Sequence, residues 1–277
     1  MIFLSFEIPA MQKALLSFNP VAALGRLTIS LVQEIGRIGL FFVRGLFHIV
    51  SVPLQFGKII HQIYFIGAKS VLVICLTGAF TGMVLGLQGY YTLSKFGSEG
   101  FLGAAVALSL IRELGPVLTA IMIIARAGSA MTAEIGIMRI SEQIDALKTM
   151  GINPVRFLVS PRLAAGLISF PLLTALFDVI GIFGGYVTGS ILLGINSGIY
   201  FSRVESSVRM TDVNGGFTKA IVFSVVVITI CCFQGYYTHT RKEGFGAKGV
   251  SLSTTSAVVI SCVLVLIVDY IVTSFLL

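Results

Sequence analysis

The chain has 277 residues, of which 56% are hydrophobic and only 11% are charged, and its mean hydropathy is +0.99. Soluble domains carry about 25% charged residues, so this composition excludes a soluble domain and indicates an integral membrane protein. The net charge of +7 does not indicate nucleic-acid binding, because the basic residues flank apolar segments, where anionic lipid headgroups are the nearer partners.

The N-terminal region predicts an interfacial helix rather than a cleavable signal. Met1–Ser5 has no positively charged residue, and Glu7 and Pro9 interrupt the apolar run. Residues 27–50 have the pattern of a basic amphipathic helix that lies in the membrane interface, and an imperfect sixth span is the alternative. The polar face of this predicted helix consists of Gln33, Arg37, Arg44 and His48.

Five later segments are long enough to cross a bilayer, which requires about 20 apolar residues in a helix. They are residues 70–93, 102–125, 163–195, 220–237 and 252–277. We therefore expect an all-α integral membrane protein with about five transmembrane helices. Lys and Arg concentrate before the first span, between the second and third, and between the last two, and such residues remain cytoplasmic. This distribution places the N-terminus in the cytoplasm and the C-terminus outside.

The first predicted span carries a stripe of glycines, Gly78, Gly82 and Gly86, at every fourth position. Glycines on one face of a helix allow a second helix to approach its backbone closely. The stripe predicts a tight helix contact, which is either one that moves when the protein changes conformation or static packing within one subunit.

Arg112 and Glu113 lie in the middle of the second predicted span. A charge near the bilayer centre costs at least roughly 2.5–3.5 kcal/mol, so such residues indicate a polar cavity or charged partners. Neighbouring helical residues point about 100° apart, so the two side chains cannot face one partner. Lys219 and Asp269, in later spans, can compensate them. The cluster is either structural ion pairing or the polar rim of a lipid cavity, where Arg112 would bind a headgroup phosphate.

Residues 139–150, between the second and third spans, predict a short amphipathic helix that is too polar to cross the membrane. Gly151 and Pro154 end it. A cytoplasmic helix of this kind fits a groove in a partner protein, and a passive interfacial loop is the alternative. Its apolar face consists of Ile140, Ile144, Leu147 and Met150, and its charged residues include Glu142, Asp145 and Lys148.

The third predicted span, residues 163–195, is longer than one perpendicular crossing requires. Tilt absorbs excess length, and Pro171 with the glycines in residues 181–185 offers places for a kink. Asp178 near its middle faces a polar cavity or pairs with a neighbouring helix. The loop that follows, residues 196–216, is either a docking surface for an extracytoplasmic partner or an ordinary connection.

No catalytic or nucleotide-binding pattern is visible in the chain. The three histidines are scattered, and the four cysteines lie in apolar spans without a histidine at ligand spacing, so we expect no catalytic pair, disulfide or zinc site. There is no Walker A sequence to hold phosphates. We expect no enzymatic activity and no cofactor in this chain; if ATP drives it, another subunit must bind ATP and Mg²⁺.

Several long motifs resemble those of one permease family. They are FTGMVLGLQG (residues 80–89), LIRELGPV (110–117), ARAGSAMTAEIG (125–136), EQ (142–143), NPVRFLVSPR (153–162), residues 214–223 and LIVDY (266–270). The chain is similar to MlaE-type (YrbE-like) permeases, the membrane subunits of ABC phospholipid transporters associated with MCE-domain proteins. The resemblance covers about residues 70–277.

The resemblance implies a homodimer in a bacterial inner membrane. It implies a cytoplasmic ABC ATPase, a periplasmic MCE-domain protein and usually a small STAS-domain protein as partners. The implied function is to move phospholipids between the inner membrane and the MCE partner, which maintains the lipid asymmetry of the outer membrane. Residues 1–66 would form an N-terminal cytoplasmic and interfacial segment with an elbow helix, and residues 67–277 the permease domain.

The resemblance also assigns roles to two sets of residues. The lipid-cavity candidates are Leu110, Arg112, Glu113, Leu114, Lys219 and Asp269. The candidates for coupling to the ATPase are Glu142, Ile144, Asp145, Leu147 and Met150. Two alternatives remain: an ion-coupled secondary carrier in which Glu113 and Asp269 take up protons, and a scaffold that only anchors the other subunits.

Overall fold

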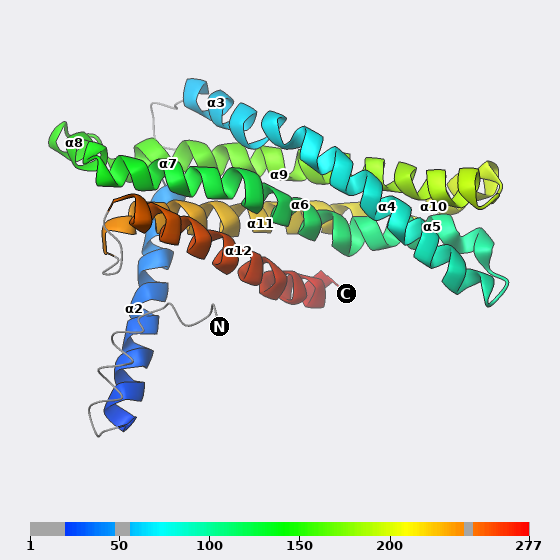
Figure 1. Cartoon of the computed structure of the whole chain (residues 1–277), viewed down its shortest axis with the longest axis horizontal. Coiled ribbons are helices and arrows are strands. Elements are labelled where there is room, and N and C mark those ends of the chain that lie inside the picture. The colour runs from blue at the N-terminus through cyan, green and yellow to red at the C-terminus, as the bar shows by residue number, and fades with distance from the viewer. Residues whose placement is uncertain (1–19, 48–55, 241–245, 277) are drawn as a thin grey trace. The chain divides into compact units, whose positions relative to one another are not determined.

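The computed structural model describes residues 20–47, 56–240 and 246–276, and the regular elements in these ranges are all helices (Figure 1). The chain separates into two compact units, residues 1–44 and 45–277. Most of helix α2 (Pro20–Phe47) belongs to the first unit. Its first residue is proline, which suits the first helical turn because the N–H there has no helical partner. The predicted N-terminal helix is confirmed, with an earlier start; His48 and Val50 lie outside the described residues.

The second unit contains five helical segments that are long and apolar enough to cross a bilayer. They are Phe56–Ser94, Glu99–Ile140, Pro154–Leu192, Met210–Tyr236 and Ala247–Leu276. The predicted all-α fold with five spans is thereby confirmed. The first segment starts before the predicted residue 70, because helix α3 (Phe56–Ile66) continues through a 3-10 turn, η1 (Ala68–Ser70), into α4 (Val71–Ser94).

Helix α11 (Met210–Tyr236) is the most enclosed of the spanning helices. It packs against α6 (Gly115–Ile123), α7 (Ser129–Ile140), α9 (Pro154–Tyr186) and α12 (Ala247–Leu276), and 67% of its most apolar stretch is buried. The corresponding share for α12 is 11%. In a single copy of the chain, α12 therefore has the smallest buried share of the five spanning segments, and part of its apolar surface is left to lipid or to another protein.

The glycine stripe of α4 forms the closest helix contact in this unit, against α9. A Cβ on Gly82 would overlap the carbonyl oxygen of Gly181, and one on Gly78 would lie 3.0 Å from the carbonyl oxygen of Phe177. On the α9 side, a Cβ on Gly184 would overlap the backbone of Ala79. The α9 glycines thus serve close packing, and α9 runs without interruption through Pro161 and Pro171.

The second span is divided by two π-helical turns, η3 (Leu110–Leu114) and η4 (Ile124–Gly128), which separate α5 (Leu102–Ser109), α6 and α7. π-Helical turns inside helices are often found at functional sites. Pro116 follows η3 and has no N–H to donate to the carbonyl oxygen of Arg112, four residues earlier. That oxygen therefore lacks the donor four residues later that a regular α-helix would supply.

The predicted cytoplasmic helix over residues 139–150 is shorter than expected. Helix α7 continues to Ile140, and a separate helix, α8, covers only Gln143–Thr149. Glu142 lies between them in a left-handed conformation with φ of 59°, which breaks the helical path. Arg139 therefore belongs to α7. In the predicted loop 196–216, helix α10 (Ser197–Ser207) begins after Asn196, whose side chain accepts hydrogen bonds from the backbone N–H groups of Gly198 and Ile199.

Candidate functional site

A buried lysine on α11 connects three elements in the interior of the second unit. The side chain of Lys219 is 3% exposed. Its Nζ lies 2.6 Å from Oε2 of Glu113 on η3 and 3.0 Å from Oδ1 of Asp269 on α12, and it donates to the carbonyl oxygen of Arg112 at 2.8 Å. The carbonyl oxygen to which Pro116 has no N–H to donate thus accepts a hydrogen bond from an ammonium group.

Arg112 points to a different partner from its neighbour Glu113, as helical periodicity predicts. Its Nη2 lies 2.8 Å from Oδ1 of Asp212, and its Nε donates to the same oxygen at 2.9 Å. Asp212 is in the first turn of α11, and its Oδ2 accepts the backbone N–H of Arg209 in a capping box. The Arg112 side chain is 48% exposed, so the guanidinium has an accessible surface as well as a carboxylate partner.

Sequence reasoning did not include Asp212 or Thr273 in this cluster. Thr273 donates to Oε1 of Glu113 at 3.3 Å and to the carbonyl oxygen of Asp269 at 2.8 Å. The signal for Thr273 was its position four residues after Asp269, on the same helical face. The cluster holds three carboxylates, on Glu113, Asp212 and Asp269, and two cations, so its groups carry a formal charge of −1 when all are ionised.

The two leucines predicted beside these charges differ in environment. Leu110 is fully buried, and it packs where α9 has Gly181: a Cβ there would lie 2.8 Å from Cδ1 of Leu110. Leu114, one turn further on, is partly exposed. Among the six lipid-cavity candidates, Arg112 and Leu114 are therefore better placed than Leu110 to meet a ligand in this conformation.

Asp178 lies in the interior of the second unit, against η3 and α6. Its Oδ1 is buried and has no hydrogen-bond partner in the described part of the chain, and a Cβ on Gly115 would overlap it. The predicted pairing of Asp178 with a charged group of a neighbouring helix is not found among the described residues.

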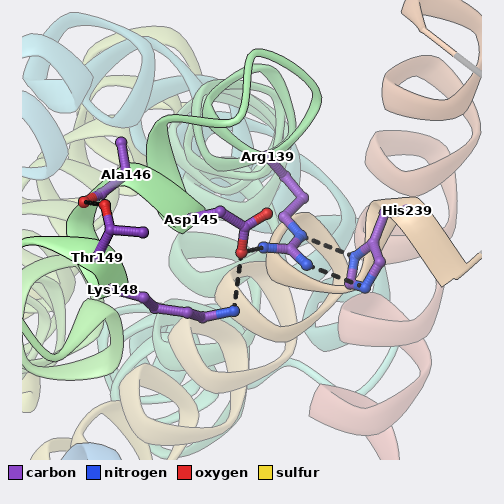
Figure 2. A network of polar contacts seen from close by, with 6 residues as sticks. All are labelled: Arg139, Asp145, Ala146, Lys148, Thr149 and His239. Carbon is purple, nitrogen blue, oxygen red and sulfur yellow. Dashed lines mark hydrogen bonds and ion pairs between the residues drawn. The ribbon is translucent and has the colours of Figure 1, made fainter.

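A second polar network surrounds α8, the helix in the segment predicted to bind a partner protein (Figure 2). Arg139, in the last turn of α7, donates from Nη1 to Oδ1 of Asp145 at 2.8 Å, and Lys148 Nζ donates to the same oxygen at 2.9 Å. On its other edge Arg139 contacts His239, in the turn η6 (Thr238–Thr240) that follows α11. The hydrogen bonds from Lys148 and Arg139 hold the pKa of Asp145 below its usual value.

The five coupling candidates divide into buried and accessible groups. Ile144 is fully buried within the chain, so its side chain anchors α8 to the rest of the second unit. Leu147 and Asp145 are partly exposed, and Glu142 and Met150 are exposed, Met150 by 71%. A partner protein that docks on α8 would therefore meet Met150 and the charged side chains first.

Metal binding has no basis among the described side chains, where no group of three His, Cys, Asp or Glu residues is arranged to hold an ion. The chemistry available to the two networks is ion pairing, hydrogen bonding to phosphate and mechanical movement.

Comparison with known proteins assigns the family. The Permease MlaE family matches residues 59–275. The chain belongs to the MlaE permease family. This confirms the resemblance seen in the sequence motifs, and it makes the five-span chain an ABC transporter permease, a class of membrane subunit that works with an ATPase.

Individual relatives of this MlaE-family chain cover most of its length. A probable ABC transporter permease protein of Rickettsia bellii is 42% identical over 255 residues, which cover 92% of this chain and 96% of the relative. The intermembrane phospholipid transport system permease protein MlaE of Haemophilus influenzae is 42% identical over 259 residues, covering 93% and 97%. The chloroplastic protein TRIGALACTOSYLDIACYLGLYCEROL 1 of Arabidopsis thaliana is 34% identical over 227 residues, covering 82% and 63%.

Proposed function

We propose that this chain is the permease subunit of an ABC transporter that moves phospholipids between the inner membrane and an extracytoplasmic MCE-domain partner. The Haemophilus influenzae relative, whose name states intermembrane phospholipid transport, carries this proposal because it aligns with 93% of the chain. In a double-membraned bacterium this movement would maintain the lipid asymmetry of the outer membrane. A STAS-domain protein is proposed as a further cytoplasmic partner.

The cluster around Lys219 is proposed to border the lipid path. Arg112 is the group suited to a headgroup phosphate, because a guanidinium offers several N–H donors in one plane and this one is half exposed. Two copies of the chain are proposed to enclose the path, and α12, of whose most apolar stretch only 11% is buried, is a surface on which a second copy would bury apolar area. The buried Lys219 would hold Glu113 of η3 and Asp269 of α12 in fixed positions relative to each other.

The helix α8 is proposed to dock on the ATPase, which would bind ATP and Mg²⁺. An exposed methionine beside charged residues suits a groove, because its flexible side chain adapts to an irregular apolar surface. Basic residues flank α8 in sequence, which supports a cytoplasmic position for it.

The proposal predicts what accompanies the protein when the tagged chain is purified in mild detergent from its native membrane. We expect an ABC ATPase, an MCE-domain protein and phospholipid enriched over bulk membrane, all identified by mass spectrometry. Met150→Asp should release the ATPase, because a charge replaces the apolar contact, and Phe96→Asp should retain it. Phe96 is a matched control since it is 78% exposed and lies in the turn after α4.

Two outcomes would contradict the proposal. Recovery of the wild-type chain alone, with lipid no different from the bulk membrane, would favour an ion-coupled carrier. Retention of the ATPase by Met150→Asp would remove α8 as its docking site.

A further inference from the structure

Arg139 occupies the point at which the second span passes into α8. It is in the last turn of α7, its side chain is 11% exposed, and its Nη1 holds Asp145 of α8. The chain then turns through Glu142, whose left-handed backbone is the covalent connection to α8. The Arg139–Asp145 contact is therefore a second, non-covalent connection between α7 and α8.

The opposite edge of the same guanidinium faces the connection between α11 and α12. Its Nε donates to Nδ1 of His239 at 2.9 Å, and its Nη2 lies 3.1 Å from Nε2 of the same ring. The imidazole stacks on Tyr237 with ring centres 6.3 Å apart, and the guanidinium lies 5.8 Å from the ring centre of Tyr236. Figure 2 shows Arg139 between Asp145 and His239, with contacts to both.

A planar guanidinium held on two edges transmits displacement. Its donors are fixed in one plane, so a shift of Asp145 with α8 moves or rotates the group and strains the contacts with His239. The connection at His239 leads to α12, which carries Asp269, while α11 before it carries Lys219. Movement of one helix against the other would act on the 3.0 Å contact between these two residues.

We propose that Arg139 and His239 are positioning residues that link α8 to the connection between α11 and α12. A movement of the ATPase would then reach α12 through these two side chains, in addition to reaching α7 through its covalent connection with α8. This inference rests on the proposed function, because it requires an ATPase on α8. It assigns a mechanical role to His239, which the sequence placed among scattered histidines.

The link requires a neutral imidazole. Neutral histidine keeps one ring nitrogen as an acceptor, whereas imidazolium has none and would place a second positive charge against Arg139. Burial, and next the charge of Arg139, lower the pKa of His239. The charged groups that act on this ring are Arg139 on α7 and Asp145 and Lys148 on α8, and Lys248 lies in the first turn of α12. Arg241, Lys242 and Glu243 lie outside the described residues. The contact is thus present at neutral pH and lost as the pH falls through the lowered pKa.

Two substitutions at His239 distinguish the contribution of its acceptor nitrogen from that of its planar ring. His239→Phe keeps a planar ring beside Tyr237 and removes the acceptor, and His239→Asn removes the ring but places a carbonyl oxygen near the position of Nδ1. Each is purified as the native complex and reconstituted in vesicles with fluorescently labelled phosphatidylglycerol. The measurement is the amount of lipid transferred per ATP hydrolysed, between pH 5 and pH 8.

We expect His239→Phe to lower the transfer per ATP by about 2- to 30-fold, the range for substitutions along a coupling connection, with the ATPase still bound. His239→Asn should restore most of it, and should abolish the decline on acidification that the wild type shows. Normal transfer per ATP in His239→Phe, or no recovery in His239→Asn, would overturn the inference. Loss of the ATPase or of lipid transfer in the wild-type complex would instead refute the proposed function.

Discussion

At the scale of single residues, the site depends on groups that satisfy one another across helices. Pro116 removes the donor that an α-helix would supply to the Arg112 carbonyl, and Lys219 provides a donor in its place. The same ammonium balances Glu113 and Asp269. The sequence left two interpretations of these charges, structural pairing and a lipid path, and a set of neutral substitutions distinguishes them.

Lys219→Met is expected to destabilise the purified protein by up to about 3 kcal/mol, because it leaves two carboxylates without their cation. The value is at the low end for a broken buried pair, since Glu113 is 43% exposed. Thermal unfolding in detergent measures it. The triple variant Lys219→Met, Glu113→Gln, Asp269→Asn should recover stability and still fail to transfer lipid. Normal transfer by the triple variant would show that the charges serve only the fold.

At the scale of elements, the contact between α4 and α9 depends on the absence of side chains. Gly78, Gly82 and Gly86 face Phe177, Gly181 and Gly185. A carbonyl oxygen of α9 occupies the space of a Cβ on Gly82, and others lie 3.0 Å and 3.1 Å from the Cβ positions of Gly78 and Gly86. Periodicity predicted a tight contact for α4, because glycines at every fourth residue lie on one face. It did not name α9 as the partner.

Gly82→Ala is expected to destabilise the protein by about 1–3 kcal/mol or more, because its methyl group would overlap backbone atoms, which cannot move aside as a side chain can. Gly57→Ala in α3 is the control, since no atom lies within 4 Å of a Cβ there. Thermal unfolding of both variants in the same detergent is the measurement. Equal stability of the two would mean that α4 and α9 separate readily.

At the scale of the whole second unit, five spans place α8 and α10 at opposite ends of the helices. The turn between α7 and α9 carries α8, and the turn between α9 and α11 carries α10, so one spanning helix, α9, separates them (Figure 1). The distribution of Lys and Arg predicts that α8 is cytoplasmic and α10 is outside. A single crossing between the two makes this orientation directly testable.

Cysteine labelling in spheroplasts with a membrane-impermeant maleimide should modify Ser206→Cys on α10, and should modify Thr149→Cys on α8 only after lysis. Both positions are exposed. The unsubstituted chain gives the background, because its four cysteines lie within spanning segments and are buried or partly buried. Labelling of Thr149→Cys in intact spheroplasts would reverse the predicted orientation.

The sequence by itself determined the features that depend on local periodicity and composition. These are the five apolar spans, the tight glycine face of α4, the divergence of Arg112 from Glu113 and the presence of a short helix between the second and third spans. Each follows from the spacing of residues along one helix, so no knowledge of its neighbours is needed. The boundaries were less certain: α3 extends the first span, and the strained backbone at Glu142 shortens the cytoplasmic helix.

Only the tertiary structure decided which distant groups meet. Arg112 with Asp212, and Arg139 with His239, are each separated by 100 residues in sequence. The burial of Ile144, which a helical face shared with Met150 did not predict, also depends on what packs against α8. A helix pattern shows which residues share a face but leaves open which helix covers it, because the same apolar face can pack against several neighbours. The packing of η3 against α11 and α12, and of α7 and α8 beside η6, makes that choice and creates both charged networks.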